Sequence, residues 1–408
     1  MATIVQKFGG SSLADLEKLG KVADLVMATR RAGHDLVVVV SAMGKTTDGL
    51  LELARKAACP GAEASAEPAR RELDMLVSTG ERVSMALLSI AIRARGGDAV
   101  SLTGSQSGII TNDRHFDARI LEVRPFRIED ELARGRIVIV AGYQGMSYRR
   151  EITTLGRGGS DTTAVALAAA LDAERCEIYS DVDGVYTADP KRVPGAMHLS
   201  GIDYETMQEM AECGAKVLNA RAVEWARRHR ITIAARRTDD FACGERGRET
   251  LVSAELESSL RPRAIVGERG LALLRAPARS ARELLSAAAA AELTLRDLTL
   301  EGGRLCASLA LVSCPDFGRA RARLAAAAPD GLELLEGLAQ VSVVGVGVGS
   351  DPGIACEAFV SLPEAPLAFS TTPLRASAVL PDEALLAAER AWHAAFAASP
   401  ELQGRTAA

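Results

Sequence analysis

The sequence predicts an α/β fold followed by a smaller α+β region, and three observations support this prediction. A glycine-rich turn at 154–159 runs directly into an alanine- and leucine-rich helix that reaches Leu171. Residues 36–40 are continuously apolar, as expected for a strand that is covered on both faces. Strands and helices alternate up to about residue 250, and the rest of the chain twice shows the order of a small α+β unit.

In the first part of the chain, each strand is expected to end in a turn rich in glycine or hydroxyl residues and to lead into a helix. In an α/β fold such turns lie at the carboxyl ends of the strands, where ligands bind. The stretch 103–111 is predicted to be a loop. The expected strands are 3–8, 36–40, 99–102, 137–141 and 176–180, and the expected helices lie near 19–26, 77–94, 162–171, 204–211 and from 214 onward.

The glycine-rich turn is the strongest candidate for a binding site. Gly156, Gly158 and Gly159 would allow a ligand close to the backbone, and Ser160 and Asp161 stand where the N-cap of a helix starting at Thr162 belongs. A helix N-terminus approached by glycines binds anions. A plain strand-to-helix turn would also use glycines. However, the opposite charges of Arg157 and Asp161 inside the turn cost desolvation energy unless a ligand or partner uses them.

Several other motifs and classes are excluded. Gly44-Lys45-Thr46 resembles the end of a P-loop, but Val39 stands where the first glycine of that motif is required. The aspartates between Asp181 and Asp189 lack the spacing of an EF-hand and fit turns better. Seven cysteines scattered singly predict free, largely buried thiols and no metal site.

Composition also limits the partners and the location. A net charge of −5 argues against nucleic-acid binding, for which a basic face is expected. No apolar run is expected to reach the length of a membrane span, and the N-terminus resembles a strand rather than a signal peptide. The sequence therefore predicts a cytoplasmic protein with no membrane partner.

Beyond about residue 250 the pattern predicts two βαββαβ-like units, at 264–336 and 337–398. The second unit lacks an obvious last strand. In the first unit the expected strands are 271–276, 293–300, 305–312 and 332–335, with helices at 281–292 and 317–328. In the second they are 341–346 and two short strands near 368 and 376, with helices at 354–362 and 383–396.

Five motifs in one order make residues 3–236 resemble the aspartate kinase family: Lys7–Ser12, Gly80–Arg82, Gly156–Asp161, Ser180–Tyr186 and Gly214–Lys216. The resemblance implies that residues 1–250 form a three-layer α/β/α sandwich of the amino-acid kinase type. It also implies transfer of the ATP γ-phosphoryl group to the side-chain carboxylate of L-aspartate, the first step of the lysine, threonine and methionine branch. The two C-terminal units resemble the ACT domains of that family, through which a homodimer is expected.

The residues fit this chemistry independently of the family name. A carboxylate is already ionised near neutral pH, so it needs no general base, and none of the five histidines lies in these motifs. The difficulty is the repulsion between a carboxylate and a triphosphate. Catalysis is therefore expected to depend on positioning and positive charge.

The resemblance assigns a role to each site residue. Lys7 and Lys216 would flank the transferring group, and Asp161 would hold both lysines. Mg²⁺ would be held mainly by phosphates and water, with no protein metal site. Phosphate binding falls to Gly9, Gly10, Ser11, Gly158, Gly159 and Ser160; substrate binding to Ser41, Thr47, Glu81 and Arg157; and nucleotide binding to Ser180, Asp181, Tyr186, Lys191 and Lys216.

Two of these assignments have simpler alternatives, and one motif departs from the family. Lys191 could be a solvated turn residue, and Glu81 could be an acidic residue at a helix N-terminus. Asn219 and Ala220 stand where the family usually has His-Pro. Two other functions stay open: the same chemistry on an aspartate analogue, or a sensor that binds nucleotide or amino acid without turnover.

Feedback control by lysine or threonine is expected to be weak, absent or altered. The effector turn of the first unit is replaced by Ala276-Pro-Ala-Arg-Ser280, which contains neither aspartate nor glycine. A candidate effector site survives in the second unit, although Asp-Pro-Gly is also a good turn in any protein. Its residues are Ser350, Asp351, Gly353, Ser370 and Thr371.

Overall fold

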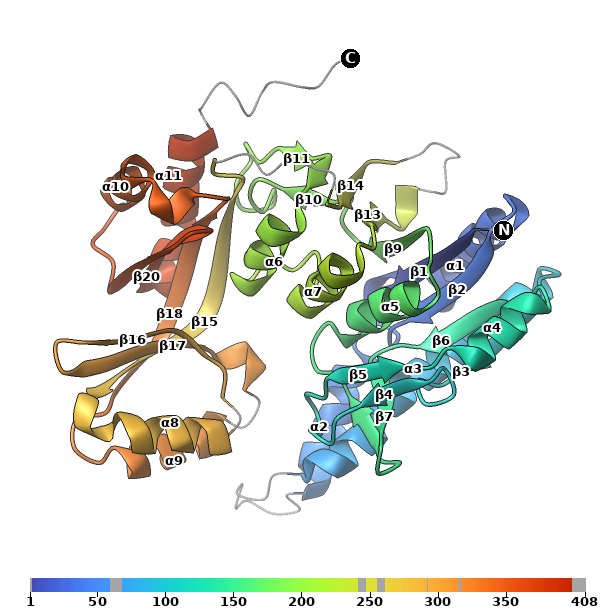
Figure 1. The fold of residues 1–408 in the computed structure, drawn as a ribbon, viewed down its shortest axis with the longest axis horizontal. Coiled ribbons are helices and arrows are strands. Elements are labelled where there is room, and N and C mark those ends of the chain that lie inside the picture. Colours follow the sequence, from blue (N-terminus) through green and yellow to red (C-terminus); the bar gives the residue numbers. More distant parts are fainter. Residues whose placement is uncertain are drawn as a thin grey trace. The chain divides into compact units, whose positions relative to one another are not determined.

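The computed structural model describes residues 2–58, 68–240, 247–254, 261–291, 293–314 and 317–397. The chain forms two compact units, shown in Figure 1, which are called the first and the second unit from here on. Both α+β units predicted from the sequence fall within the second of them. The first consists of Met1–Val185, His198–Ala211 and Lys216–Ser258. The second consists of Tyr186–Met197, Glu212–Ala215 and Ser259–Ala408. Of the seven cysteines, Cys59 and Cys243 lie outside the described residues. The other five form no disulfide, as predicted, but only Cys176 and Cys213 are buried, whereas Cys306 and Cys314 are partly exposed and Cys356 is exposed.

The first unit is built on an eight-stranded sheet with the order β12-β14-β13-β9-β1-β2-β6-β3. Neighbouring strands from β13 to β3 are all parallel, so their carboxyl ends lie at the same edge of the sheet. The strands are β1 (Thr3–Phe8), β2 (Asp35–Val40), β3 (Ala99–Leu102), β6 (Ile137–Ala141), β9 (Arg175–Ser180), β12 (Gly201–Ile202), β13 (Ile233–Arg237) and β14 (Glu249–Val252).

Helices cover both faces of this sheet and give it three layers. On one face α1 (Leu16–Arg31) and α3 (Arg70–Ala94) share a buried apolar cluster with alternate residues of β1 and β2, such as Ile4 and Val38. On the other face α5 (Gly159–Ala170) packs against β1, β2 and β9. Figure 1 shows α7 (Ala220–His229) beside α5. The predicted three-layer α/β/α architecture is confirmed.

The remaining elements of the first unit lead into these layers. Helices α2 (Thr46–Ala58), α4 (Phe126–Ala133) and α6 (Tyr204–Glu212) complete the set of described helices. A second sheet has the order β5-β4-β7-β8, with β4 (Ile109–Thr111), β5 (Ile120–Val123), β7 (Gln144–Ser147) and β8 (Ile152–Thr154). Part of the stretch predicted as a loop is therefore the strand β4. The short strands β10 (Val185–Tyr186) and β11 (His198–Leu199) follow β9 and pair with each other, and the chain passes from the first unit to the second within β10.

Several helices begin at other residues than predicted, and three of them lie near the candidate site. Helix α3 begins at Arg70 rather than Val77, because the polar residue Asp74 is buried on its inner face instead of marking a surface segment. Helix α5 begins at Gly159 rather than Thr162, with Gly158 as its N-cap. The helix expected from Gly214 begins at Ala220, after its N-cap.

By length and composition, α3 is the one described helix that could cross a membrane, contrary to the expectation that no apolar run is long enough. In this fold it is a core helix. Leu88 and Ile92 pack in the sheet cluster, and the carboxylates of Asp74 and Glu81 are buried inside the unit as well.

The second unit has one six-stranded antiparallel sheet, with the order β16-β17-β15-β18-β20-β19. Helices α8 (Ala281–Ala290), α9 (Phe317–Ala327), α10 (Pro352–Val360) and α11 (Leu385–Ala397) pack against it. The strands are β15 (Ala264–Pro277), β16 (Leu295–Glu301), β17 (Arg304–Ala310), β18 (Glu333–Val344), β19 (Ala368–Thr372) and β20 (Arg375–Pro381).

Two strands of this sheet run through both predicted α+β units. The stretches 332–335 and 341–346, predicted as separate strands, belong to the single strand β18. The break expected between them is only a glycine at positive φ, Gly337, and the paired strand β15 has Gly270 at positive φ beside a register shift. Glycines at such positions accommodate a bulge within a strand. The first half of β15, Ala264–Arg269, pairs with 339–344 of β18 and so stands where the second predicted unit lacked a strand.

Trp392 on α11 provides a stability test of the second unit. Its indole is fully buried in the apolar cluster and donates a hydrogen bond to the carbonyl of Ala358, 2.8 Å away. We expect Trp392→Ala to lower the free energy of unfolding by about 3–5 kcal/mol, the usual cost of deleting a buried aromatic side chain. Urea unfolding followed by circular dichroism measures this. The same change at the half-buried Trp225 should cost less, and a loss below about 1 kcal/mol at Trp392 would contradict the packing described here.

Candidate functional site

The candidate site lies where β1 and β2 end at the middle of the first sheet. After β1 the backbone turns at Gly9, whose N–H donates to the carbonyl of Tyr179 at the end of β9. Gly10 sits against the loop after β2: a Cβ atom on Gly10 would lie 2.8 Å from the carbonyl oxygen of Ala42, and the Gly44 N–H donates to the Gly10 carbonyl. Gly10 is therefore required for this close approach of the β1 and β2 loops.

Lys7 and Asp161 form a buried ion pair at this edge. The Nζ atom of Lys7 in β1 lies 2.6 Å from Oδ1 of Asp161 in the first turn of α5, and each side chain is 11% exposed. Asp161 is placed favourably because the N-terminus of a helix carries partial positive charge. A Cβ atom on Gly9 would lie 3.5 Å from the same Nζ, so the ammonium group borders the backbone of the first glycine loop.

The N-terminus of α5 lacks a side-chain cap. Its N-cap is Gly158 in the left-handed region (φ 72°), and no side chain bonds to the N–H groups of the first turn. Gly142 at the end of β6 also makes room for this turn, since a Cβ atom there would lie 2.9 Å from Ser160. Ser160 and Asp161 are thus the second and third residues of the helix and not N-caps, because glycine supplies the cap conformation. The first turn remains a suitable anion-binding site.

Glu81 lies in the middle of α3, which excludes its interpretation as a helix N-terminal residue. Gly80 brings the helix close to the β2 loop, because a Cβ atom on it would lie 2.8 Å from that of Ala42. The Ala42 N–H donates to Oε1 of Glu81, whereas Oε2 is buried without a partner in the described structure. Desolvation raises the pKa of Glu81 to about 7. A buried carboxylate with one oxygen unused is suited to bind a cation.

Asp74, which is not among the predicted site residues, contacts the end of β8, just before the glycine-rich turn. It is fully buried and accepts hydrogen bonds from Thr154 Oγ1 at the end of β8, from the Phe116 N–H and from the ring of His115. Burial raises its pKa, although these hydrogen bonds act in the opposite direction. Asp74 and Glu81 are seven residues apart on α3, about two helical turns, and so lie on the same face. This spacing is the sequence signal that points to Asp74.

The other residues predicted to bind substrate lie either at the ends of the strands and helices that form the site or on the exposed surface. Ser41 follows β2, with its N–H bonded to the Phe8 carbonyl, and Thr47 lies in the first turn of α2. The side chain of Arg157 is exposed between two glycines of the turn. Lys216 is also exposed, and in the described part of the chain no ion pair joins it to Asp161.

On the proposed nucleotide side, the predicted residues divide between the two units. Ser180 ends β9 and its hydroxyl bonds to the backbone of Val182, while Asp181 is exposed. Tyr186 and Lys191 belong to the second unit. The Lys191 N–H donates to Asp189 in a turn and its side chain is exposed, which also fits a solvated turn residue.

In the second unit the candidate effector turn is a capped helix start. Asp351 is the N-cap of α10 and accepts hydrogen bonds from the N–H groups of Gly353 and Ile354, at 2.7 and 3.2 Å. Ser350 precedes it, and Ser370 and Thr371 lie on β19. The carboxylate of Asp351 therefore occupies the N–H groups that an effector carboxylate would need.

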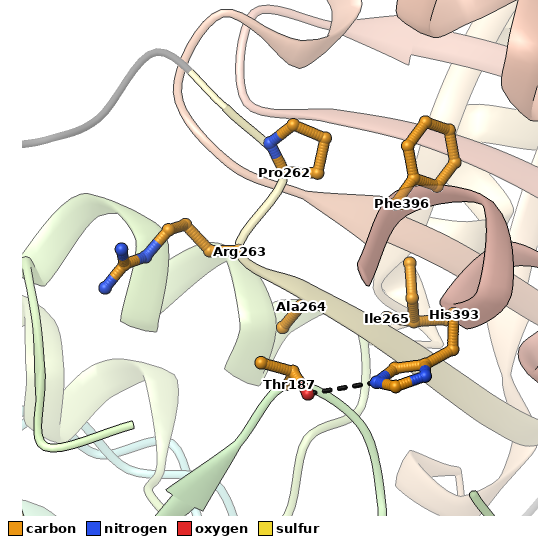
Figure 2. Close-up of a pocket in the computed structure, with 7 residues that line it drawn as sticks. All are labelled: Thr187, Pro262, Arg263, Ala264, Ile265, His393 and Phe396. Carbon is orange, nitrogen blue, oxygen red and sulfur yellow. Dashed lines mark hydrogen bonds between the residues drawn. The ribbon is translucent and has the colours of Figure 1, made fainter. Parts of the chain in front are cut away.

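A small pocket elsewhere in the second unit contains none of the predicted site residues. It is lined by Thr187, Pro262, Arg263, Ala264, Ile265, His393 and Phe396 (Figure 2). The hydroxyl of Thr187 accepts from the Met197 N–H and lies 3.1 Å from Nε2 of His393, whose pKa is lowered by burial. The hydroxyl and the imidazole therefore satisfy each other within the unit, which is a structural arrangement.

Comparisons with known proteins decide the family. Residues 2–234 match the model of the amino acid kinase family. An aspartokinase of Mycolicibacterium smegmatis is 42% identical over 97% of this chain and 96% of its own length. The chain belongs to the aspartokinase family. Aspartokinase 2 of Bacillus subtilis is 40% identical, covering 97% of this chain and 98% of that protein.

A solved structure agrees with this assignment to the aspartokinases. Aspartokinase III of E. coli in complex with aspartate and ADP has a TM-score of 0.83 and 26% sequence identity, covering 97% of this chain and 99% of that one. The match to aspartokinases spans almost the whole chain, so the prediction of an aspartate kinase is confirmed and the sensor alternative is not favoured.

For an aspartokinase, the raised pKa of Glu81 predicts a pH dependence of aspartate use. If Glu81 binds the ammonium group of aspartate, only the ionised carboxylate binds well, and it forms as pH rises through about 7. We expect kcat/KM for aspartate to fall as pH decreases from 8 to 6, with an apparent pKa near 7.

The matched variant for this measurement is Glu81→Gln. It should lower kcat/KM at pH 8 and flatten the profile, because the amide does not ionise in this range. A profile in Glu81→Gln that still bends near the same pH would assign the titration to another group.

Proposed function

We propose that the residues at the carboxyl ends of β1 and β2 and the N-terminus of α5 carry out the aspartokinase reaction in this chain. In this reaction an oxygen of the L-aspartate side chain bonds to the γ-phosphorus of ATP. The bond from that phosphorus to the bridging oxygen of ADP breaks, and the products are 4-phospho-L-aspartate and ADP. The observation that carries the proposal is the buried Lys7–Asp161 pair beside an uncapped helix N-terminus.

Positive charge is what this transfer requires from the protein. The acceptor carboxylate needs no deprotonation, but it must approach a polyanion. The ammonium group of Lys7, held by Asp161 at 2.6 Å, is a fixed donor for the oxygens of the transferring group. Lys216 is proposed to act from the other side. Its exposed side chain is free to close on a nucleotide when one is bound.

Backbone N–H groups are proposed to bind the phosphates. Those of Gly10 and Ser11 follow β1, and those of Gly158 and Ser160 open α5. The N–H groups of Gly9 and Gly159 already donate to the carbonyls of Tyr179 and Gly156, so these two glycines are proposed only to let the phosphates approach the backbone. Mg²⁺ would enter with the nucleotide and neutralise part of its charge. Asp161, which is paired with Lys7, is proposed to hold that lysine and not the metal, which would be bound mainly by phosphates and water.

The acceptor side is proposed to recognise the amino-acid backbone of aspartate. Glu81, with an unpaired buried oxygen, would accept from the α-ammonium group. Arg157 would bind the α-carboxylate through both arms of its guanidinium group. Ser41 and Thr47, after β2 and at the start of α2, would border the reacting carboxylate. Ser180, Asp181, Tyr186 and Lys191 are proposed for the nucleotide.

Replacement of either lysine tests this arrangement directly. Lys7→Ala or Lys216→Ala should lower kcat by about 10²- to 10³-fold with a smaller change in KM, the usual cost of removing one preorganised donor. Trapping of the acyl phosphate with hydroxylamine, given ATP, Mg²⁺ and a panel of acidic amino acids, measures it. Lys21→Ala, on the exposed face of α1, is the matched control and should retain activity.

The result also tests the substrate. Near wild-type kcat in a lysine variant would remove that lysine from the mechanism. A hydroxamate signal with another acid and none with aspartate would overturn the acceptor proposed here.

We also propose a homodimer formed through the second unit. Its sheet ends in two edge strands, β16 and β19, and β16 exposes Leu298 (47%) and Leu300 (63%). Exposed edges with apolar side chains are sites of pairing with another chain. Because Asp351 occupies the helix N–H groups of the remaining effector turn, we propose that lysine and threonine have little effect on activity.

Light scattering tests the dimer. The full chain should have twice the monomer mass, and Leu300→Lys should shift it toward monomer because the lysine charge would have to be buried in the interface. Leu16→Lys, at a residue that is 69% exposed in the first unit, should leave the mass unchanged. A monodisperse monomer of the unmodified chain would refute the proposal.

A further inference from the structure

Asn219 forms hydrogen bonds in two directions between α7 and the glycine-rich turn. Its Oδ1 accepts from the backbone N–H groups of Arg221 (3.0 Å) and Ala222 (3.4 Å), which makes it the N-cap of α7. Thr162 Oγ1 donates to the same oxygen at 3.4 Å. Its Nδ2 donates to the carbonyl of Arg157 at 3.0 Å. Only this orientation of the amide satisfies both sides, since the oxygen must face N–H donors and the nitrogen a carbonyl.

The bond to Arg157 acts on a flexible point of the turn. Gly156 and Gly158, on either side of Arg157, both have positive φ (74° and 72°), a region that restrains glycine little. The Arg157 carbonyl and the Gly158 N–H belong to one planar peptide group and point in opposite directions. Fixing the carbonyl toward α7 therefore also fixes the direction of the Gly158 N–H.

Packing reinforces this arrangement. A Cβ atom on Gly158 would lie 2.4 Å from Nδ2 of Asn219, so the two residues are in direct contact. The next residue of α7 to contact the turn is Arg221, which donates to the Leu155 carbonyl (3.3 Å) and pairs with Asp117 (2.7 Å). The first turn of α7 thus holds the glycine-rich turn before and after Gly156.

We propose that Asn219 is a positioning residue for phosphoryl transfer, acting through the Arg157–Gly158 peptide. By holding this peptide it sets the direction of one phosphate-binding N–H and limits the backbone freedom of Arg157. Its N-cap bonds and its bond to Arg157 are separable, because they use different atoms of the side chain. This inference rests on the proposed roles of Arg157 and Gly158 in the site.

Three variants separate the two functions. Asn219→Ser and Asn219→Asp keep an N-cap acceptor of similar strength, but serine is too short to reach the Arg157 carbonyl and aspartate cannot donate to it. Asn219→Ala loses both functions. Asp15→Asn exchanges the same two residue types at the N-cap of α1, where the side chain accepts from the Lys18 N–H, and serves as the control.

We expect kcat to fall about tenfold in all three Asn219 variants, with KM for ATP changed less than threefold, because the N–H contributes most when charge develops on the transferring group. The melting temperature should fall by several degrees in Asn219→Ala only. The control should keep wild-type kcat.

Two outcomes overturn the proposal. Wild-type kcat in Asn219→Ser would show that the Arg157 bond has no role, and any loss in Asn219→Asp would then come from its charge. A loss of kcat restricted to Asn219→Ala, together with its lower melting temperature, would show that Asn219 acts only as the N-cap of α7. In both cases the unmodified enzyme still forms hydroxamate with aspartate, whereas failure of the proposed function would abolish that signal in the unmodified enzyme.

Discussion

The buried pair of Lys7 and Asp161 is the interaction on which the rest of the first unit depends. It joins the central strand β1 to the start of α5, a helix buried over most of its length. Burying two charges costs desolvation energy that their attraction offsets only with good geometry, so such a pair is a poor device for stability alone. Its position suits a site in which the ammonium group of Lys7 must stay fixed beside a polyanion, because Asp161 holds that group in place.

The neighbouring loops keep this pair in place through close backbone packing. Gly10 allows the β1 loop to contact the β2 loop, Gly80 brings α3 against Ala42, and Gly142 leaves room for Ser160. Each contact would be blocked by a single Cβ atom. The residues with recognisable chemistry are therefore few, and their geometry is set by glycines whose role is steric.

Much of this unit could be predicted because its strands are buried on both faces. The apolar runs 36–40 and 137–141 match β2 and β6 closely, and the motif residues Lys7, Asp161 and Glu81 gather near the ends of β1, β2 and α5. Asp74 could not be found this way, since a lone aspartate in an amphipathic helix normally faces water. Nor could β18, because a glycine within a strand and a glycine in a turn look alike in sequence.

At the start of α10, a side chain of the protein itself occupies N–H groups that could otherwise bind a carboxylate from solution. Asp351 is tethered one residue before the helix, and its carboxylate already accepts from Gly353 and Ile354. A tethered group competes at a high effective concentration, in the millimolar range for short links. An amino acid arriving from solution would have to displace this resident carboxylate before its own could bind. Substitution of Asp351 would therefore lower the concentration at which a carboxylate from solution could bind these N–H groups, without altering the sheet beneath the helix.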